Sequence, residues 1–164
     1  IRDPDHSLVG SEMCIRDSII ADEPTTALDV TVQAQILALL NDLRRERGLA
    51  ILFITHDFGV VGQICERIAV MYAGQIVEQG PWEAVLARPA HPYTRRLIAC
   101  VPELGGGKRR LSAIPGLPPA VDRLPRGCAF APRCDRATDA CSADKIALTG
   151  TTRRVRCLHP EAAT

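Results

Sequence analysis

The apolar residues of the chain form short continuous runs and helical repeats, separated by polar turns. Ile19–Ala21 and Ala50–Ile54 are apolar runs bounded by polar residues, which predicts two buried strands. The segment between them, Val30–Arg47, has the length of a helix, and Gly48 follows it in the position of a C-cap. Its expected core face repeats at helical spacing and comprises Ile36, Leu37, Leu40 and Leu43.

Further along, the pattern continues with short elements. The pattern predicts a helix over Phe58–Glu66. It then predicts two strands, Arg67–Tyr72 and Gln75–Gln79, joined through Ala73-Gly74. Pro81–Leu86 predicts another helix, because proline suits a first helical turn. The order strand, helix, strand, helix, hairpin indicates the last part of an α/β nucleotide-binding domain.

Both predicted core strands end in side chains that carry chemistry. Asp22 and Glu23 follow the first strand, and Thr55, His56 and Asp57 follow the second. Parallel strands bring their carboxyl ends to one edge of a sheet, where ligands bind. One carboxylate there can hold Mg²⁺ while the other positions or deprotonates a water. A plain helix N-cap at Asp22-Glu23 and a structural role for His56 are the alternatives.

Taken together, these strand ends resemble the Walker B, D-loop and H-loop series of ABC-type ATPases. The resemblance implies that Asp22 binds Mg-ATP, that Glu23 is the catalytic glutamate and that His56 contacts the γ-phosphate. It also implies that Thr26-Ala27-Leu28-Asp29 is the D-loop, with Asp29 at a dimer interface. ATP and Mg²⁺ are the implied cofactors, and the fold class is α/β, the C-terminal part of a P-loop ABC ATPase domain with an incomplete sheet.

Two other motifs of that family are missing from the sequence. It holds no Gly-x-x-x-x-Gly-Lys-Ser/Thr loop to cradle phosphates and no Leu-Ser-Gly-Gly-Gln-like signature. We therefore expect the C-terminal fragment of a longer ATPase. Alone, it should be inactive and should expose apolar surface that further strands cover in the whole domain.

The first eighteen residues contain a segment with a recognisable coding sequence. Residues 8–18 can be back-translated, in frame, as the transposon-end adapter used in sequencing libraries, so we interpret residues 1–18 as an artefact rather than native sequence. The alternative is a genuine loop in place of the signature helix. Native sequence is expected to start near Ile19, with the ATPase part spanning residues 19–88.

Residues 89–164 are expected to form an extension. His91-Pro92-Tyr93-Thr94 precedes an apolar helix, a turn-rich linker follows, and Ile114-Pro115-Gly116-Leu117-Pro118-Pro119 comes later. These segments resemble the C-terminal extension of ATPases that energise oligopeptide and dipeptide (peptide/nickel) importers. The resemblance implies a second ABC ATPase subunit, in a homo- or heterodimer, two membrane-spanning permease subunits and, indirectly, an extracytoplasmic peptide-binding protein. The expected location is peripheral, on the cytoplasmic face of the plasma (inner) membrane.

Four cysteines crowd this extension with the spacing C-x₅-C-x₆-C-x₁₅-C. Clustered thiols in a reducing compartment favour metal over disulfides. Four thiolates suit a [4Fe-4S] cluster or Zn²⁺, and metal-free thiols that pack a small domain are the third possibility. A segment with so few large apolar residues needs some staple to fold. The predicted ligands are Cys128, Cys134, Cys141 and Cys157.

Charge is uneven along the chain. The net charge is +1, yet residues 108–164 hold eleven Lys and Arg against five Asp and Glu. The basic residues have little aromatic interleaving and no reading helix, so we expect a solvated face or a counter to thiolate charge, and no nucleic-acid partner. The rival hypothesis is a non-transport ABC ATPase that acts on nucleic acid through a zinc-binding tail.

Overall fold

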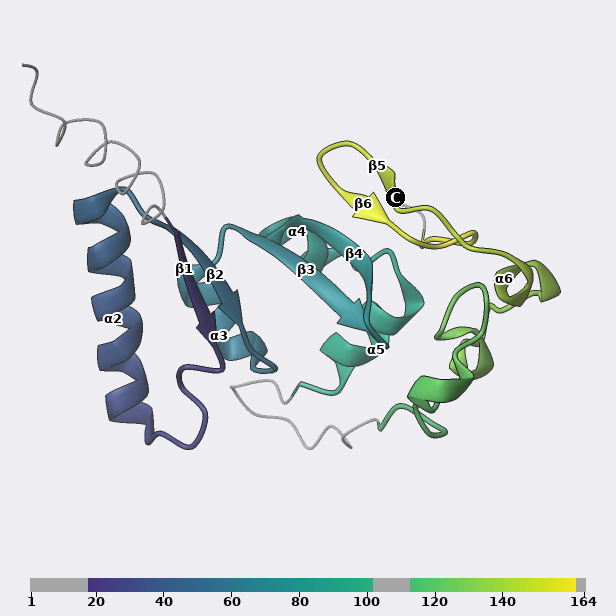
Figure 1. Ribbon diagram of the computed structural model, residues 1–164, viewed down its shortest axis with the longest axis horizontal. Helices are drawn as coiled ribbons and strands as arrows, with labels where there is room; N and C mark the ends of the chain where they lie inside the picture. Colours follow the sequence, from purple (N-terminus) through teal and green to yellow (C-terminus); the bar gives the residue numbers. More distant parts are fainter. Residues whose placement is uncertain (1–17, 102–112, 162–164) are drawn as a thin grey trace, which may run out of the picture. The chain divides into compact units, whose positions relative to one another are not determined.

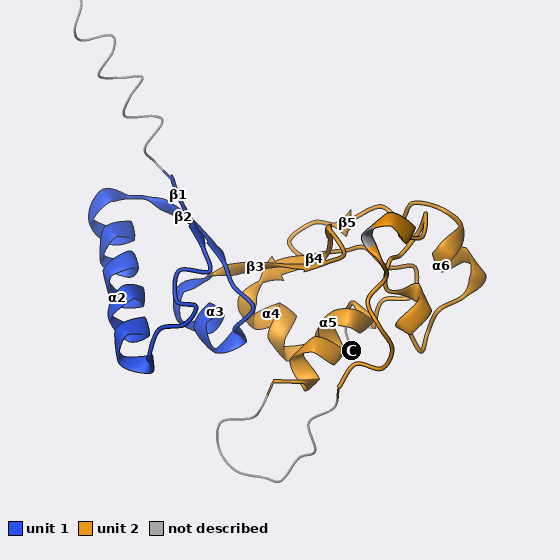
Figure 2. Ribbon diagram, turned by 60° about the horizontal axis from the view of Figure 1, so that its bottom comes forward, with its two compact units in different colours: residues 1–65 blue, residues 66–164 orange. Residues whose placement is uncertain are grey.

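A computed structural model describes residues 18–101 and 113–161, and they divide into two compact units. Unit 1 ends at Cys65 and unit 2 begins at Glu66; Figure 2 colours them separately. The expected boundary after residue 88 stays a prediction. The expected artefact lies outside the described residues except for Ser18, which pairs with Ala50 at the start of the first strand.

Unit 1 is an α/β layer. Strands β1 (Ser18–Asp22) and β2 (Ala50–Ile54) pair in parallel, and the chain between them contains helix α2 (Val30–Arg47) (Figure 1). Gly48 ends α2 with φ of 63°, the left-handed conformation that favours glycine, as predicted. Helix α3 (Phe58–Ile64) follows β2. The strand–helix–strand order with parallel pairing confirms the α/β fold class.

The core of unit 1 is smaller than the helical pattern predicts. Only Leu37 of the expected α2 core face is buried, and it packs with Val60 and Ile64 of α3 and with Phe53 of β2. The rest of that face, Ile36, Leu40 and Leu43, is only partly buried rather than buried as expected. A two-stranded sheet offers little surface for an eighteen-residue helix to cover. The other face of the sheet is bare: Ile20 is 70% exposed, Leu52 58% and Ile54 43%.

Unit 2 is built on a four-stranded antiparallel sheet in the order β3-β4-β6-β5. The strands are β3 (Arg67–Tyr72), β4 (Gln75–Pro81), β5 (Thr149–Gly150) and β6 (Arg154–Val155). Ala73 and Gly74 both have positive φ, which is the two-residue hairpin turn that suits twisted strands. The end of the chain therefore returns to pair with the predicted hairpin, with Gln79 opposite Arg154.

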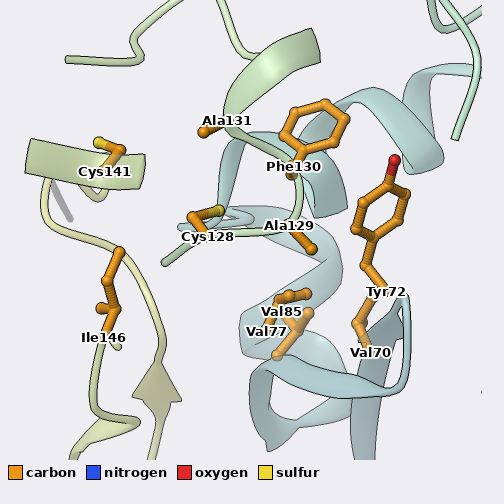
Figure 3. Close-up of a cluster of buried hydrophobic side chains, with 10 residues drawn as sticks. All are labelled: Val70, Tyr72, Val77, Val85, Cys128, Ala129, Phe130, Ala131, Cys141 and Ile146. Carbon is orange, nitrogen blue, oxygen red and sulfur yellow. The ribbon is translucent and has the colours of Figure 1, made fainter. Parts of the chain in front are cut away.

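Helices α4 (Trp82–Ala87) and α5 (Pro92–Ala99) follow β4 and pack against it. A loop-rich segment comes next, with the short helices η1 (Val121–Arg123), η2 (Ala131–Arg133) and α6 (Asp139–Ala143). The main core joins this segment to the sheet (Figure 3). Phe130 is fully buried at its centre, with its ring 5.4 Å from those of Tyr72 and Tyr93.

Most predicted elements are confirmed, with shifts at their ends. Helix α3 stops at Ile64 rather than Glu66, β4 runs on to Pro81, and α4 begins at Trp82 with Pro81 as its N-cap. Strands β5 and β6 were not predicted, because two-residue strands carry no readable periodicity.

Candidate functional site

The parallel pairing of β1 and β2 brings the predicted acidic and histidine residues to one edge. Asp22 pairs with Ile54, so the segments that follow both strands leave the sheet side by side. The backbone N–H of Glu23 donates to the Ile54 carbonyl at 2.9 Å. Glu23 also adopts a φ of 45°, which is unusual for a residue with a side chain, and such strain is concentrated at functional sites.

The carboxylate of Glu23 is held by two side chains. His56 Nδ1 lies 3.1 Å from one of its oxygens, and Thr26 donates its hydroxyl to the other at 3.0 Å. The hydrogen bond with His56 and then that with Thr26 lower the pKa of Glu23, so the group is ionised at neutral pH. The His56 side chain is 75% exposed and that of Glu23 47%, so both are open to a ligand.

Asp22 and Asp29 occupy the two ends of the loop between β1 and α2. Asp22 is exposed at the end of β1. Asp29 is the N-cap of α2 and accepts the backbone N–H of Val32 at 2.9 Å. The capping role explains how the loop holds its shape while its exposed residues, Thr26 to Asp29, remain available to a partner.

In unit 2, the four predicted cysteine ligands line a single cavity. Cys128 precedes η2, Cys134 ends it, Cys141 lies in α6 and Cys157 follows β6. Cys128 donates its backbone N–H to the Cys141 carbonyl at 2.7 Å, which ties two of these segments together. The spacing alone did not show that the four would meet, and the fold brings them to one place.

Hydrogen-bond donors surround the sulfur atoms. The backbone N–H of Arg136 donates to Cys134 at 3.4 Å, and the Thr138 hydroxyl lies 3.5 Å from the Cys141 sulfur. Burial raises the pKa of the Cys128 and Cys157 thiols, although backbone hydrogen bonds to each sulfur oppose that rise. Donors aimed at sulfur stabilise thiolates, and a thiolate is the form that binds metal.

Within the described ranges, no three histidine, cysteine, aspartate or glutamate side chains converge as the ligands of a metal ion. The four thiols line the cavity from separate segments instead. The predicted iron-sulfur or zinc centre is thus not shown.

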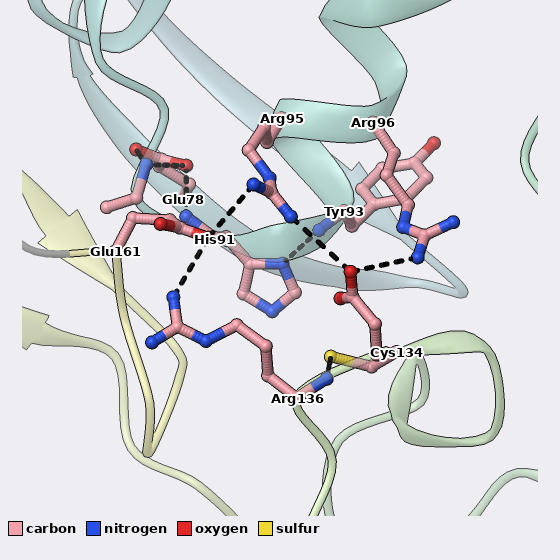
Figure 4. Close-up of polar contacts among 10 residues, drawn as sticks. Glu78, His91, Tyr93, Arg95, Arg96, Cys134, Arg136 and Glu161 are labelled. Atoms are coloured by element: carbon pink, nitrogen blue, oxygen red, sulfur yellow. Dashed lines mark hydrogen bonds and ion pairs between the residues drawn. The ribbon is translucent and has the colours of Figure 1, made fainter. Parts of the chain in front are cut away.

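His91 faces the same cavity, which the sequence did not predict. Its side chain is 1% exposed, its Nδ1 accepts the Tyr93 backbone N–H at 3.1 Å, and its Nε2 lies 3.9 Å from the Cys128 sulfur. Burial lowers the pKa of His91 to about 4, so the ring is neutral at pH 7. Figure 4 shows the imidazole pointing from α5 toward the segment that carries Cys134 and Arg136.

A buried carboxylate fixes the backbone at this point. Glu78 is fully buried on β4 and accepts the N–H groups of Ala90 and His91, the latter at 2.9 Å. Arg153 completes the site, donating its Nε to Glu78 at 2.9 Å and reaching the carbonyls of Ala84 and Arg88. The buried charge is therefore paired and fully hydrogen-bonded.

Some basic residues of the tail differ from the solvated face that was one of our two expectations. Arg156 donates to the carbonyls of Ile76 and Ile146, and Arg154 to that of Leu148. With Arg153 on Glu78, these guanidinium groups hold the last segment against the sheet. The solvated face is wrong for Arg153 and Arg156, which are partly buried, whereas Arg154 is exposed; Lys108, Arg109 and Arg110 lie outside the described residues.

An α/β layer with an Asp-Glu pair and a histidine at adjacent strand ends is the arrangement that resembles the ABC-type ATPases. Comparison with protein families gives a narrower match. Residues 77–141 match the family model described as the oligopeptide/dipeptide transporter, C-terminal region. The predicted resemblance to ATP-binding proteins of peptide importers is confirmed.

Several relatives are similar over most of this chain. The oligopeptide transport ATP-binding protein OppD of Haemophilus influenzae is 53% identical over 129 residues, covering 79% of this chain and 40% of the relative. The dipeptide transport ATP-binding protein DppD of Escherichia coli is 45% identical over 149 residues, covering 90% of this chain and 46% of the relative. The chain thus spans less than half the length of these relatives.

The described part of the chain contains no helix long and apolar enough to cross a bilayer.

Proposed function

We propose that this chain is part of the energy-coupling ATPase subunit of an importer for oligopeptides or dipeptides. The observation that supports this most strongly is the Glu23–His56 pair at the ends of two parallel strands, in a chain similar to peptide transport ATP-binding proteins. Asp22 would hold Mg²⁺ with ATP, and Asp29 would lie in the loop that faces a second ATPase subunit.

The geometry also supports a specific role for Glu23. The lowered pKa keeps Glu23 ionised, and an ionised carboxylate accepts hydrogen bonds only. Its role would be to orient the attacking water and to accept its proton, with His56 and Thr26 fixing its two oxygens. Positioning and charge stabilisation supply most of the catalysis in phosphoryl transfer.

The same resemblance supplies the partners. The complete subunit would pair with a second ATPase subunit beneath two membrane-spanning permeases, with peptide delivered by an extracytoplasmic binding protein. It would be peripheral, on the cytoplasmic face of the membrane. ATP would close the ATPase pair and hydrolysis would reopen it, so that movement is the output.

We further propose that Cys128, Cys134, Cys141 and Cys157 hold a [4Fe-4S] cluster. Four thiols line one cavity, and hydrogen-bond donors lie on their sulfur atoms. Four cysteine thiolates are the usual ligand set of such a cluster. The same four thiolates also suit a single zinc ion, which is the second candidate for this site.

The rival function, an ATPase acting on nucleic acid, has less support. Its basic tail would need free guanidinium groups, whereas Arg153 and Arg156 are partly buried and donate to groups within the chain.

Affinity recovery from a gently solubilised source strain separates the two functions. Recovery together with hydrophobic permease subunits supports the importer. Nuclease-sensitive recovery with DNA or RNA, and without membrane proteins, contradicts it.

A further inference from the structure

His91 is the one histidine of the described chain that is fully buried, and the proposed hydrolytic and metal-ligand roles leave it without a function. It is the N-cap of α5, and a serine or aspartate would cap the helix equally well. An imidazole at this position adds a second nitrogen beyond the cap. That second nitrogen faces the cysteine cavity.

The hydrogen bonds of His91 fix its tautomer. Nδ1 accepts the Tyr93 N–H, so it carries no proton, and the single N–H of the neutral ring lies on Nε2. Nε2 lies 3.9 Å from the Cys128 sulfur, and both side chains are buried. The ring also hydrogen-bonds the Arg156 backbone, so its one N–H lies between that backbone and the sulfur. The ring therefore presents a shared donor, and not a lone pair, to this sulfur.

The position of the ring is built into the fold. Glu78 accepts the backbone N–H of His91, and Arg153 neutralises Glu78. The Phe130 ring lies 6.2 Å from the imidazole. A side chain held from its backbone and its Nδ1 cannot swing away without breaking the start of α5.

We propose that the Nε2–H of His91 donates a hydrogen bond to the Cys128 thiolate and thereby raises the reduction potential of the metal centre. The inference rests on the [4Fe-4S] cluster proposed above. Reduction adds negative charge to a cluster and its thiolates, so a donor on a ligand sulfur stabilises the reduced form more than the oxidised form. His91 is a positioning and tuning residue, and it is not a ligand.

The test compares the anaerobically purified 164-residue chain with its His91→Asn and His91→Gln variants. Asparagine keeps a cap acceptor for Tyr93 but is too short to place a donor at Cys128. Glutamine is long enough to return an N–H there. Tyr93→Phe is the matched control, because it alters the same helix start without removing a donor to sulfur.

The measurements are iron and sulfide content, the midpoint potential and the iron–thiolate stretching bands. We expect His91→Asn to keep its cluster and to disfavour reduction by roughly tenfold, a 59 mV fall for a one-electron couple. His91→Gln should recover part of this shift, and Tyr93→Phe should match the unmodified chain.

Three results would overturn the inference. An intact cluster with unchanged potential and bands in His91→Asn would show that the proton serves the nearby Arg156 backbone alone. Loss of iron from both His91 variants would assign the residue a purely structural role. Absence of iron from the unmodified chain would refute the cluster itself. This result is distinguishable from a failure of the His91 inference, because it is seen in the protein without any substitution.

Discussion

His56 Nδ1 lies 3.1 Å from Glu23 Oε1, across the ends of two neighbouring parallel strands. The two residues are 33 positions apart in the sequence, and the register of Asp22 opposite Ile54 brings them together. The carboxylate is thereby oriented by side chains of the chain itself. Preorganisation of this kind lowers the cost of placing a water in line with a phosphate.

The first prediction concerns the ionisation of Glu23. Because hydrogen bonds with His56 and Thr26 lower its pKa, removing either partner should raise that pKa toward its ordinary value. A lowered pKa means that the contact stabilises the folded protein at pH values above the pKa that Glu23 has in the unfolded chain. This stabilisation is lost as the pH falls through the pKa of Glu23 in the folded protein. Carboxyl NMR titration of His56→Ala checks this. An unchanged Glu23 titration would show that the pair does not form in solution.

The second prediction concerns the buried Glu78–Arg153 pair. Glu78→Gln leaves the Arg153 guanidinium without its counter-charge and weakens the acceptor of the Ala90 and His91 N–H groups. We expect a loss of about 3 kcal/mol in the free energy of unfolding of unit 2. Glu83→Gln, the same change at an exposed site on α4, should cost less than about 0.5 kcal/mol. Equal losses by chemical denaturation would contradict the assignment.

The third prediction concerns the metal centre. Anaerobically purified protein should be brown, and Cys134→Ser should remove the colour with most of the iron and sulfide, because one of four thiolates is lost. Cys65→Ser, in unit 1, should leave the iron content unchanged. Colourless protein with stoichiometric zinc would favour structural zinc, and protein with neither metal would refute both centres.

The fourth prediction concerns Gly127, beside the cysteine cavity. A Cβ on this residue would lie 2.2 Å from the Cys141 carbonyl oxygen, so the two cysteine-bearing segments must move apart in Gly127→Ala. We expect reduced iron content and a lower unfolding temperature for unit 2. Gly59→Ala, in α3 of unit 1, should leave the iron content unchanged; normal iron content in Gly127→Ala would refute the close approach.

Much of the fold could be predicted from local signals. Helix α2 begins after the Asp29 cap and ends at Gly48, and β3 was predicted at its observed bounds because apolar periodicity and turn residues agree there. The strand-end site was predictable for the same reason, since parallel strands must end at one edge. The partner of His56 was not, because hydrogen-bonding choices depend on the loop that carries Glu23 and Thr26.

Other features depend on tertiary structure. Charge predicts exposure, so no local signal indicated that Arg153 would reach a buried carboxylate 75 positions away. His91 lay within a recognised motif, and its role was missed because nothing local shows that α5 starts beside Cys128. The one available signal was that His91 and the four cysteines belong to the same extension, where a thiol is a suitable partner for a buried imidazole.

The most direct test of the central claim is ATP turnover by Glu23→Gln. A chimera that joins the preceding part of Escherichia coli DppD to this chain at Ile19 would supply the missing phosphate-binding segment. We predict retained ATP binding with turnover lowered about 10²-fold or more, while Glu46→Gln, an exposed change on α2, has no effect. Turnover by Glu23→Gln close to that of the unmodified chimera would show that the catalytic carboxylate lies elsewhere.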